Sequence, residues 1–316
     1  MGSVEATGAL TRVTLPADGP AIAIRDLAKS YGHVHAVRGV TFDVQRGEIF
    51  GFLGLNGAGK TTTIRILLDL LRPSRGRAQL FGFDCQRQSR LARATVGYMP
   101  GELGFYSDTS GIELLDLMAR LSGGGLDTTW RWKLADRLEL ARADLRRPLR
   151  AYSTGKKRKL GLIQALQADP PLLILDEPTE GLDPLVQRSL HELLFELRAR
   201  GRTVFMSSHV LSDVERLCDR IGVIREGEIV LLSTVEEAKR RSGRTVRIQF
   251  TRPVDTMPLP AGMSLVGQAP DRWSVRVEHD IGALLPLLGG LPVRDLDILE
   301  PALEDVLRSF YRTDRP

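Results

Sequence analysis

Cysteine is nearly absent from this sequence, which contains only Cys85 and Cys218 among 316 residues. The two form neither a Cys-x-x-Cys pair nor a zinc-ligand spacing, which argues against a disulfide scaffold and a cysteine metal site. Such a composition is typical of a protein in a reducing compartment.

Long apolar segments are also missing. No stretch reaches the roughly 18 uninterrupted apolar residues that a membrane-spanning helix needs, and the mean hydropathy is -0.10. The N-terminus lacks the basic-then-apolar order of a secretory signal, and Ala6 stands where a myristoylation signal has Ser or Thr. The sequence therefore predicts no membrane anchor of its own.

The excess of one charge sign is small, since 44 basic and 39 acidic residues give a net charge of +5. The chain has no long run of like charges. This balance permits contact with nucleic acid or anionic lipid but indicates neither, and we predict no nucleic-acid partner. The apolar fraction of 42% is too high for a disordered chain.

What the sequence does contain is an alternation of short apolar strands and amphipathic helices. Fully apolar runs at Ile49–Leu53 and Leu172–Leu175 are typical of buried parallel strands. Helical apolar spacing occurs at Thr62–Leu71 and Val186–Arg200. This alternation predicts an α/β fold with a mostly parallel sheet.

Changes in composition divide the chain into three predicted parts. Residues 1–20 are expected to form a flexible tail, residues 21–234 an α/β domain, and residues 235–316 a small α+β domain. Residues from about 90 to 168 form a mostly helical subdomain of the α/β domain. Its predicted helices are Ile112–Leu121, Leu134–Leu140 and Lys156–Leu166.

In the C-terminal part, alternating apolar residues predict strands at Arg244–Phe250 and Trp273–Val277. The region between them is broken by prolines and a glycine, namely Pro253, Pro258, Pro260, Gly262 and Pro270. A last helix is expected at Ala302–Tyr311.

Residues Gly54–Thr61 read GLNGAGKT, a glycine followed by four residues and Gly-Lys-Thr. Backbone N–H groups must surround a phosphate here, and side chains would block its approach, which explains the glycines. The loop follows a buried strand and opens a helix, whose N-terminal dipole favours an anion. We expect Lys60 to reach the β- and γ-phosphates and the Thr61 hydroxyl to ligate Mg²⁺. The pattern predicts a nucleotide-binding site.

Two carboxylates, Asp176 and Glu177, directly follow the apolar strand Leu172–Leu175. In open α/β sheets, ligands bind at this carboxyl end of the strands. We expect Asp176 to hold Mg²⁺, directly or through water, and Glu177 to orient or deprotonate an attacking water. The alternative, a helix-capping pair, is weakened by the phosphate loop upstream.

Three shorter segments complete an ordered set: Ser153-Thr154-Gly155, Gly181-Leu182-Asp183, and His209 after a strand. A Ser-Thr-Gly turn before a helix is by itself typical of an N-cap. Its position about twenty residues before the strand that carries the carboxylates favours a functional role instead.

Together these motifs resemble the nucleotide-binding subunit of an ATP-binding-cassette (ABC) transporter, over about Ile22–Leu232. Gly54–Thr61 matches the Walker A motif, and Asp176 and Glu177 match the Walker B aspartate and the catalytic glutamate. Residues 153–155 match the signature motif. The resemblance implies an ABC-type P-loop ATPase domain with a helical signature subdomain, which hydrolyses ATP with Mg²⁺.

The resemblance also implies a role for each matching residue. Tyr31, in KSYG, matches the aromatic that stacks on adenine, Asp183 matches the D-loop, and His209 matches the switch histidine that contacts the γ-phosphate. The implied catalytic residues are Glu177, His209 and Lys60. The implied nucleotide-binding residues are Tyr31, Asn56, Gly57, Ala58, Gly59, Lys60, Thr61, Thr62, Ser153, Gly155 and Asp183.

Some positions depart from the family pattern. Leu55 replaces a usual proline and Lys156 a usual glutamine, and the second residue of the signature is Thr154 rather than glycine. The loop glutamine that touches Mg²⁺ in the family is here Gly101, followed by Glu102. The metal set is therefore Thr61, Asp176 and, as a substitute for the glutamine, Glu102; the alternative is a loop that couples through backbone and water.

The sequence GEL after YMP, the YSTG signature and the closing EPALEDV resemble drug and antibiotic exporters of the daunorubicin-resistance type. The resemblance implies the energy subunit of a membrane exporter for multidrug or antibiotic efflux, peripheral to the cytoplasmic face of the membrane. Its implied partners are a separate transmembrane permease and a second copy in a head-to-tail homodimer, which supplies Ser153 and Gly155 across the interface. The alternatives are an ABC importer subunit, whose C-terminal region would be a small β-barrel, and a soluble non-transport ABC ATPase.

Two groups of residues match no motif. The remaining histidines, His33, His35, His191 and His279, are interpreted as surface or packing residues. The basic run Lys156–Lys159 is either a solvated helix face or a face turned toward phosphate or membrane.

Overall fold

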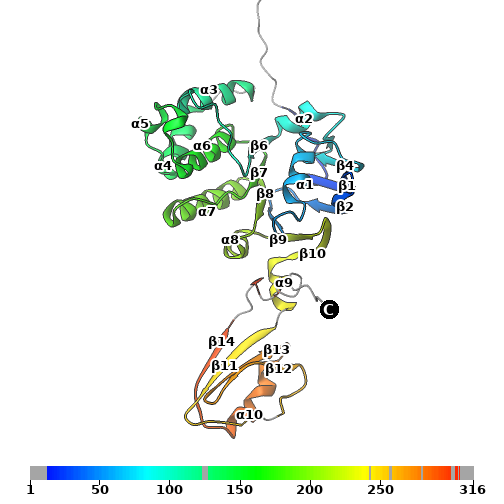
Figure 1. The fold of residues 1–316 in the computed structure, drawn as a ribbon, viewed down its shortest axis with the longest axis vertical. Helices are drawn as coiled ribbons and strands as arrows, with labels where there is room; N and C mark the ends of the chain where they lie inside the picture. The colour runs from blue at the N-terminus through cyan, green and yellow to red at the C-terminus, as the bar shows by residue number, and fades with distance from the viewer. Residues whose placement is uncertain are drawn as a thin grey trace, which may run out of the picture. The chain divides into compact units, whose positions relative to one another are not determined.

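The computed structural model of the protein describes residues 13–122, 127–241, 243–255, 258–278, 280–299, 303–304 and 306. It divides into two compact units, Met1–Leu232 and Ser233–Pro316. A six-stranded sheet with the order β10-β9-β3-β8-β7-β6 forms the centre of the first unit (Figure 1). Its strands are β3 (Ile49–Leu53), β6 (Val96–Met99), β7 (Leu172–Asp176), β8 (Thr203–Ser208), β9 (Arg220–Arg225) and β10 (Glu228–Thr234).

The strands from β9 to β6 pair in parallel, and β3, β7 and β8 are buried along their whole length. Parallel strands need crossover connections, which helices supply here. These are α1 (Lys60–Leu67), α2 (Ser89–Ala94), α7 (Pro184–Ala199) and α8 (Leu211–Leu217). The predicted α/β class is confirmed.

A second, antiparallel sheet with the order β2-β1-β4-β5 packs on the first. Its strands are β1 (Ile22–Tyr31), β2 (Val34–Val44), β4 (Arg75–Leu80) and β5 (Phe83–Asp84). Phe42 of β2 lies 5.5 Å from the ring centroids of both Phe50 and Phe52, and 6.5 Å from that of Phe205. Aromatic burial of this kind stabilises the contact between the two sheets.

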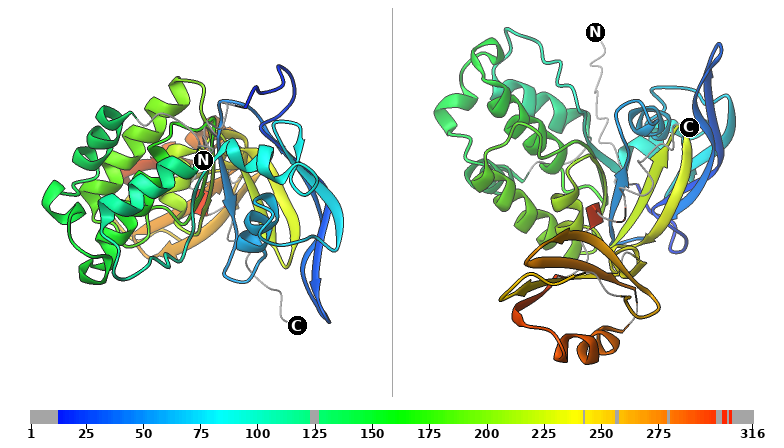
Figure 2. Two further views of the ribbon diagram at one scale, coloured as in Figure 1. Left: turned by 90° about the horizontal axis from the view of Figure 1, so that it is seen from above. Right: turned by 60° about the horizontal axis from the view of Figure 1, so that its bottom comes forward.

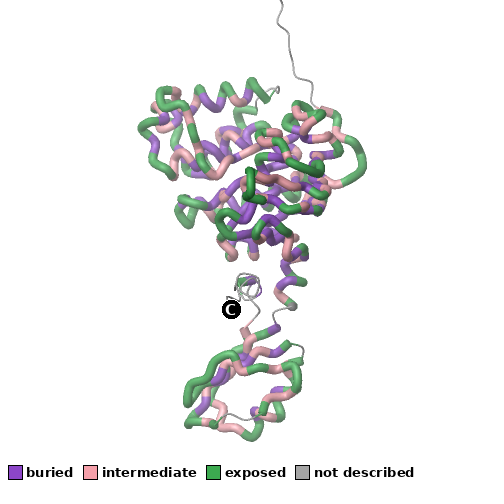
Figure 3. The backbone as a smooth tube through the Cα atoms, turned by 45° about the vertical axis from the view of Figure 1, so that its right-hand side comes forward, coloured by how far each residue is buried: buried purple, intermediate pink, exposed green. Residues whose placement is uncertain are grey.

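A helical part lies on the side of the first unit opposite the antiparallel sheet (Figure 2). It contains α3 (Gly111–Leu121), α4 (Thr128–Arg137), α5 (Arg142–Leu145), η1 (Leu149–Ala151) and α6 (Thr154–Leu166). The helix predicted at Leu134–Leu140 was misplaced, because Asp127 caps α4 and the helix starts at Thr128. Figure 3 shows buried positions throughout the interior of this unit.

The second unit contains α9 (Val235–Arg241), β11 (Arg244–Phe250), β12 (Met263–Ala269), β13 (Arg272–Val277), η2 (Ile281–Leu284), α10 (Leu285–Gly289) and β14 (Val293–Leu299). Its antiparallel sheet has the order β12-β13-β11-β14, and Trp273 packs edge-on to Phe250 with centroids 5.0 Å apart. The region between the two predicted strands contains β12, which was not predicted and which lies between the breaking residues Gly262 and Pro270. Of the predicted last helix, only residues 303, 304 and 306 lie within the described part.

Within the described residues, every helix is too short or too polar to cross a membrane. Both cysteines are buried and free. Among the unassigned histidines, His33 and His35 are exposed and His191 is buried, whereas His279 lies outside the described residues.

Candidate functional site

The loop between β3 and α1 carries the predicted phosphate site. Gly57 and Gly59 have φ values of 80° and 113°, a region that favours glycine. A Cβ atom at Gly59 would lie 2.5 Å from the carbonyl oxygen of Ala36, and one at Gly54 would lie 2.5 Å from that of Ile224. Gly57 is therefore required for the loop conformation, Gly54 for its close packing, and Gly59 for both.

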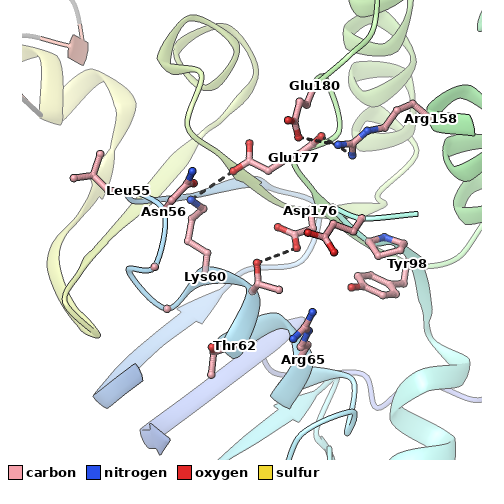
Figure 4. A pocket seen from close by; sticks show the side chains of 16 residues that line it. Leu55, Asn56, Lys60, Thr62, Arg65, Tyr98, Arg158, Asp176, Glu177 and Glu180 are labelled. Atoms are coloured by element: carbon pink, nitrogen blue, oxygen red, sulfur yellow. Dashed lines mark hydrogen bonds and ion pairs between the residues drawn. The ribbon is translucent and has the colours of Figure 1, made fainter. Parts of the chain in front are cut away.

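Lys60, the first residue of α1, is 6% exposed. Its Nζ donates a hydrogen bond of 2.6 Å to the carbonyl oxygen of Gly54 and lies 3.5 Å from Oε1 of Glu177 (Figure 4). A buried ammonium needs such partners, and it is here directed at the cavity that the loop encloses. The lysine is thus positioned to exchange a carboxylate partner for a phosphate.

Asp176 ends β7 and is 3% exposed. Its carboxylate accepts hydrogen bonds from the hydroxyls of Thr61, at 3.2 Å, and Ser207. A hydroxyl beside a carboxylate is a donor set that suits Mg²⁺, so Thr61 and Asp176 fit the expected ion. The described residues contain no cluster of three or more His, Cys, Asp or Glu side chains that could hold a metal.

Glu177 has a φ of 52°, which is uncommon for a residue with a side chain. Its backbone N–H donates to the hydroxyl of Ser207 at 3.1 Å and to the Ser207 carbonyl oxygen at 3.2 Å. Its Oε2 accepts from the His209 N–H at 3.2 Å and lies 2.8 Å from His209 Nδ1. Lys60, Glu177 and His209 therefore form a continuous polar chain.

Lys60, Asp176 and Glu177 meet at a cavity of about 410 Å³. Of the predicted residues, the cavity is lined by Asn56, Gly57, Gly59, Lys60, Thr61, Thr62, Glu102, Asp176 and Glu177. The carboxyl ends of β3 and β7 lie along one edge of the central sheet, which explains why residues so distant in sequence converge there. The arrangement is suited to binding a phosphorylated ligand and directing a carboxylate at its reacting end.

The comparisons with known proteins agree with this geometry. The family described as ABC transporter matches residues 37–180. The bacitracin transport ATP-binding protein BcrA of Bacillus licheniformis is 35% identical over 229 residues, which are 72% of this chain and 74% of that protein. The chain belongs to the ABC transporter ATP-binding proteins. It is an ABC ATPase.

Two further relatives support the assignment. The Nod factor export ATP-binding protein I of Paraburkholderia xenovorans is 42% identical over 209 residues, which are 66% of this chain and 68% of that protein. A solved ATP binding subunit of an ABC transporter is 31% identical, with a TM-score of 0.65, over 72% of this chain and 92% of that one.

Six predicted residues of this ABC ATPase do not line the cavity: Tyr31, Ala58, Ser153, Gly155, Asp183 and His209. Tyr31 ends β1 and is 49% exposed, with Lys29 Nζ 5.1 Å from its ring centroid. Ala58, within the loop between β3 and α1, is buried. The stacking of Tyr31 on adenine stays a prediction.

Ser153 and Asp183 both cap helices. Ser153 accepts a hydrogen bond from the Lys156 N–H at 3.3 Å, and Asp183 accepts one from the Val186 N–H at 3.0 Å. The Val186 contact lowers the pKa of Asp183 below its ordinary value. Ser153 is therefore the N-cap of α6. Its side chain is also exposed, so the cap does not prevent contact with a nucleotide bound to another ABC subunit.

Gly101 lies beside the Asp176 carboxylate, where a Cβ atom would be 3.2 Å from Oδ2. Its φ is not positive, so the backbone conformation does not require glycine. The short distance to the Asp176 carboxylate is what disfavours a side chain at this position. Glu102 is exposed and lines the same cavity. A metal role for Glu102 stays a prediction.

Sequence reasoning missed three residues near the reacting groups, Arg65, Tyr98 and Ser207. It also left open whether the basic run that contains Arg158 faces solvent or phosphate. Ser207 bonds to both Asp176 and Glu177 from the end of β8. Burial and the Asp176 carboxylate raise the pKa of Tyr98 to about 12. Arg158 lies inside the predicted basic run, but only the fold reveals that it lines the cavity whereas Lys156 pairs with Asp144.

Proposed function

We propose that this ABC ATPase is the energy-supplying subunit of a membrane exporter of drug or antibiotic type. The carrying observation is the similarity to ATP-binding proteins whose names specify bacitracin transport and Nod factor export. A site that joins a phosphate loop to a carboxylate at the reacting end supports hydrolysis as the source of energy. Its partners are a separate transmembrane permease and a second copy of the chain.

In the proposed reaction, Lys60 and the loop amides bind the phosphates of ATP, and Glu177 orients the attacking water. Mg²⁺, held by Thr61 and Asp176, would neutralise phosphate charge. His209 keeps the Glu177 carboxylate oriented through the 2.8 Å contact. Because His209 does not itself line the cavity, its contact with the γ-phosphate would form only when the nucleotide is bound. Ser153 and Gly155 of a second copy in head-to-tail arrangement cover the open side of the nucleotide.

The importer alternative predicts a small β-barrel in the C-terminal region. The described residues of the second unit instead form one sheet, β12-β13-β11-β14, in which β12 and β14 are not neighbours. This architecture favours the exporter proposal over the importer.

The experiment that tests the proposal first determines whether a membrane protein is encoded in the neighbouring reading frame and then co-expresses that protein with this chain. We expect the two proteins to co-purify and to export at least one compound from a panel of antibiotics, bacitracin among them, only while ATP is hydrolysed. Uptake in place of export, or no association with a membrane protein, would contradict it.

Glu102→Ala tests the unusual loop. If Glu102 replaces the missing glutamine, this change is expected to uncouple ATP hydrolysis from export, because no side chain at position 101 or 102 then reaches the metal region. Glu102→Gln is the matched control and is expected to be tolerated. ATPase and export are measured together, and normal values of both in Glu102→Ala would make Glu102 a solvated loop residue.

Ending the chain at Thr234 tests the second unit, which lies beyond every predicted nucleotide contact. Nucleotide binding is expected to persist, while dimer formation or coupling to the permease weakens. Trp273→Ala tests the same point in the full chain. Trp273 is 1% exposed, so its truncation is expected to destabilise the second unit by about 3–5 kcal/mol while nucleotide binding persists. A folded truncated chain that binds no nucleotide would argue against a separate accessory role.

A further inference from the structure

Arg158 of α6 reaches the reacting groups from the helical part of the chain. It is 7% exposed, and its Nη1 donates to the backbone carbonyl oxygen of Glu177 at 3.3 Å. Its Nη2 donates to Oε2 of Glu180 at 2.7 Å, as Figure 4 shows. A buried guanidinium must be paired or hydrogen-bonded, and here both of its partners lie within four residues after the end of β7.

Glu177 has a backbone that needs external support. A positive φ in a residue with a side chain is strained and persists only where the surroundings enforce it. Ser207 holds the N–H of Glu177, while Arg158 and the Glu180 N–H hold its carbonyl oxygen. Both peptide groups that flank the strained Cα are therefore anchored, one of them by a charged donor.

A comparison with Arg131 separates this contact from ordinary structural pairing. Arg131 is also buried, at 2% exposure, and also belongs to the helical part. It donates to Asp116 at 2.5 Å and to Gln167 at 3.0 Å, and none of these residues lines the cavity. Arg131 therefore joins helices to one another, whereas Arg158 joins a helix to the residue that carries the carboxylate.

We propose that Arg158 is a positioning residue for Glu177 in ATP hydrolysis. By anchoring the Glu177 carbonyl and the Glu180 carboxylate, it holds the strained backbone in the conformation that directs the Glu177 side chain at Lys60 and His209. Because α6 starts at the signature turn, the same contact transmits the position of that turn to Glu177. This inference rests on the proposed role of Glu177 as the residue that orients water.

The test measures single-turnover hydrolysis of radiolabelled ATP by the full chain, together with ATP affinity. Arg158→Gln is expected to slow hydrolysis by about 10- to 100-fold at saturating ATP, because small displacements of a reacting group are costly. The ATP affinity is expected to stay unchanged. Arg158→Lys is expected to restore part of the rate, since an ammonium can still donate to the carbonyl.

Arg131→Gln is the matched control, because it also removes a buried arginine from the helical part. It is expected to lower the melting temperature without slowing hydrolysis. Should Arg131→Gln slow hydrolysis as much as Arg158→Gln, or should Arg158→Gln weaken ATP binding as much as it slows the rate, the positioning role is overturned.

The decisive measurement repeats Arg158→Gln in the Glu177→Gln background. If Arg158 acts through Glu177, the second change adds no further loss, because residues that act as a unit are not additive. An equal loss in both backgrounds contradicts the inference. Wild-type hydrolysis in Glu177→Gln alone would instead contradict the proposed role of Glu177, so the two failures are distinguishable.

Discussion

Glu177→Gln is expected to reduce ATP turnover by about 10²- to 10⁴-fold, the usual contribution of a general base. The amide has nearly the size of the carboxylate but cannot accept the proton of the attacking water. Since Glu177 lies 3.5 Å from Lys60, loss of its charge also removes an ion pair that competes with phosphate for the lysine. ATP binding should therefore be retained.

The measurement combines steady-state ATPase activity with size-exclusion chromatography in ATP. We expect the variant to accumulate as a dimer with ATP bound, because hydrolysis is the step that would release the partner. Glu102→Gln is a suitable control, since it neutralises another carboxylate that lines the cavity and is expected to retain turnover. A Glu177→Gln protein that hydrolyses ATP at the wild-type rate would contradict the role of Glu177 as the general base.

Lys60→Ala is expected to lower turnover by at least about 10²-fold, as the loss of one preorganised charge-stabilising group does elsewhere. It should also weaken ATP binding, because Lys60 is the ammonium directed at the phosphate cavity. The change additionally leaves the buried side of Glu177 without its nearest cation. The weaker ATP binding and the unpaired Glu177 carboxylate both lower the rate of ATP hydrolysis.

Lys60→Arg is expected to fail as well, although it keeps the charge. Lys60 Nζ donates to the Gly54 carbonyl at 2.6 Å in a buried position, and the planar guanidinium has a different shape and donor geometry. Lys133→Ala, at an exposed position of α4, is the control and should leave ATPase activity and ATP affinity unchanged. Normal hydrolysis by Lys60→Ala with the permease present would contradict the phosphate-loop interpretation.

The local sequence was sufficient to predict the phosphate loop and the strand that ends at Asp176, because each requires particular residue types at fixed positions along the chain. The glycines of residues 54–59 predicted a loop that other residue types would disturb. A Cβ atom would clash with neighbouring backbone at Gly54 and Gly59, and Gly57 has a positive φ. The apolar run before Asp176 predicted a buried parallel strand with carboxylates at its end, since only a fully covered strand is apolar on both faces.

Elements that depend on pairing were predicted less well. The strand β12 was missed because proline and glycine mark turns around it, while its stability comes from pairing with β13. The start of α4 was missed because its N-cap, Asp127, and the apolar pair of Trp130 and Leu134 at helical spacing were not recognised in the sequence.

Tertiary structure alone decided which side chains contact Glu177 in addition to the predicted Lys60 and His209. Nothing in the spacing of Ser207 or Arg158 relates either residue to the carboxylate, and both reach it only because β8 lies beside β7 and α6 approaches the same edge of the sheet. The same holds for Gly101, whose missing side chain matters only because the fold brings Asp176 against it. Motifs record the groups that must touch the ligand, whereas the contacts that orient those groups depend on distances that the linear order of residues does not contain.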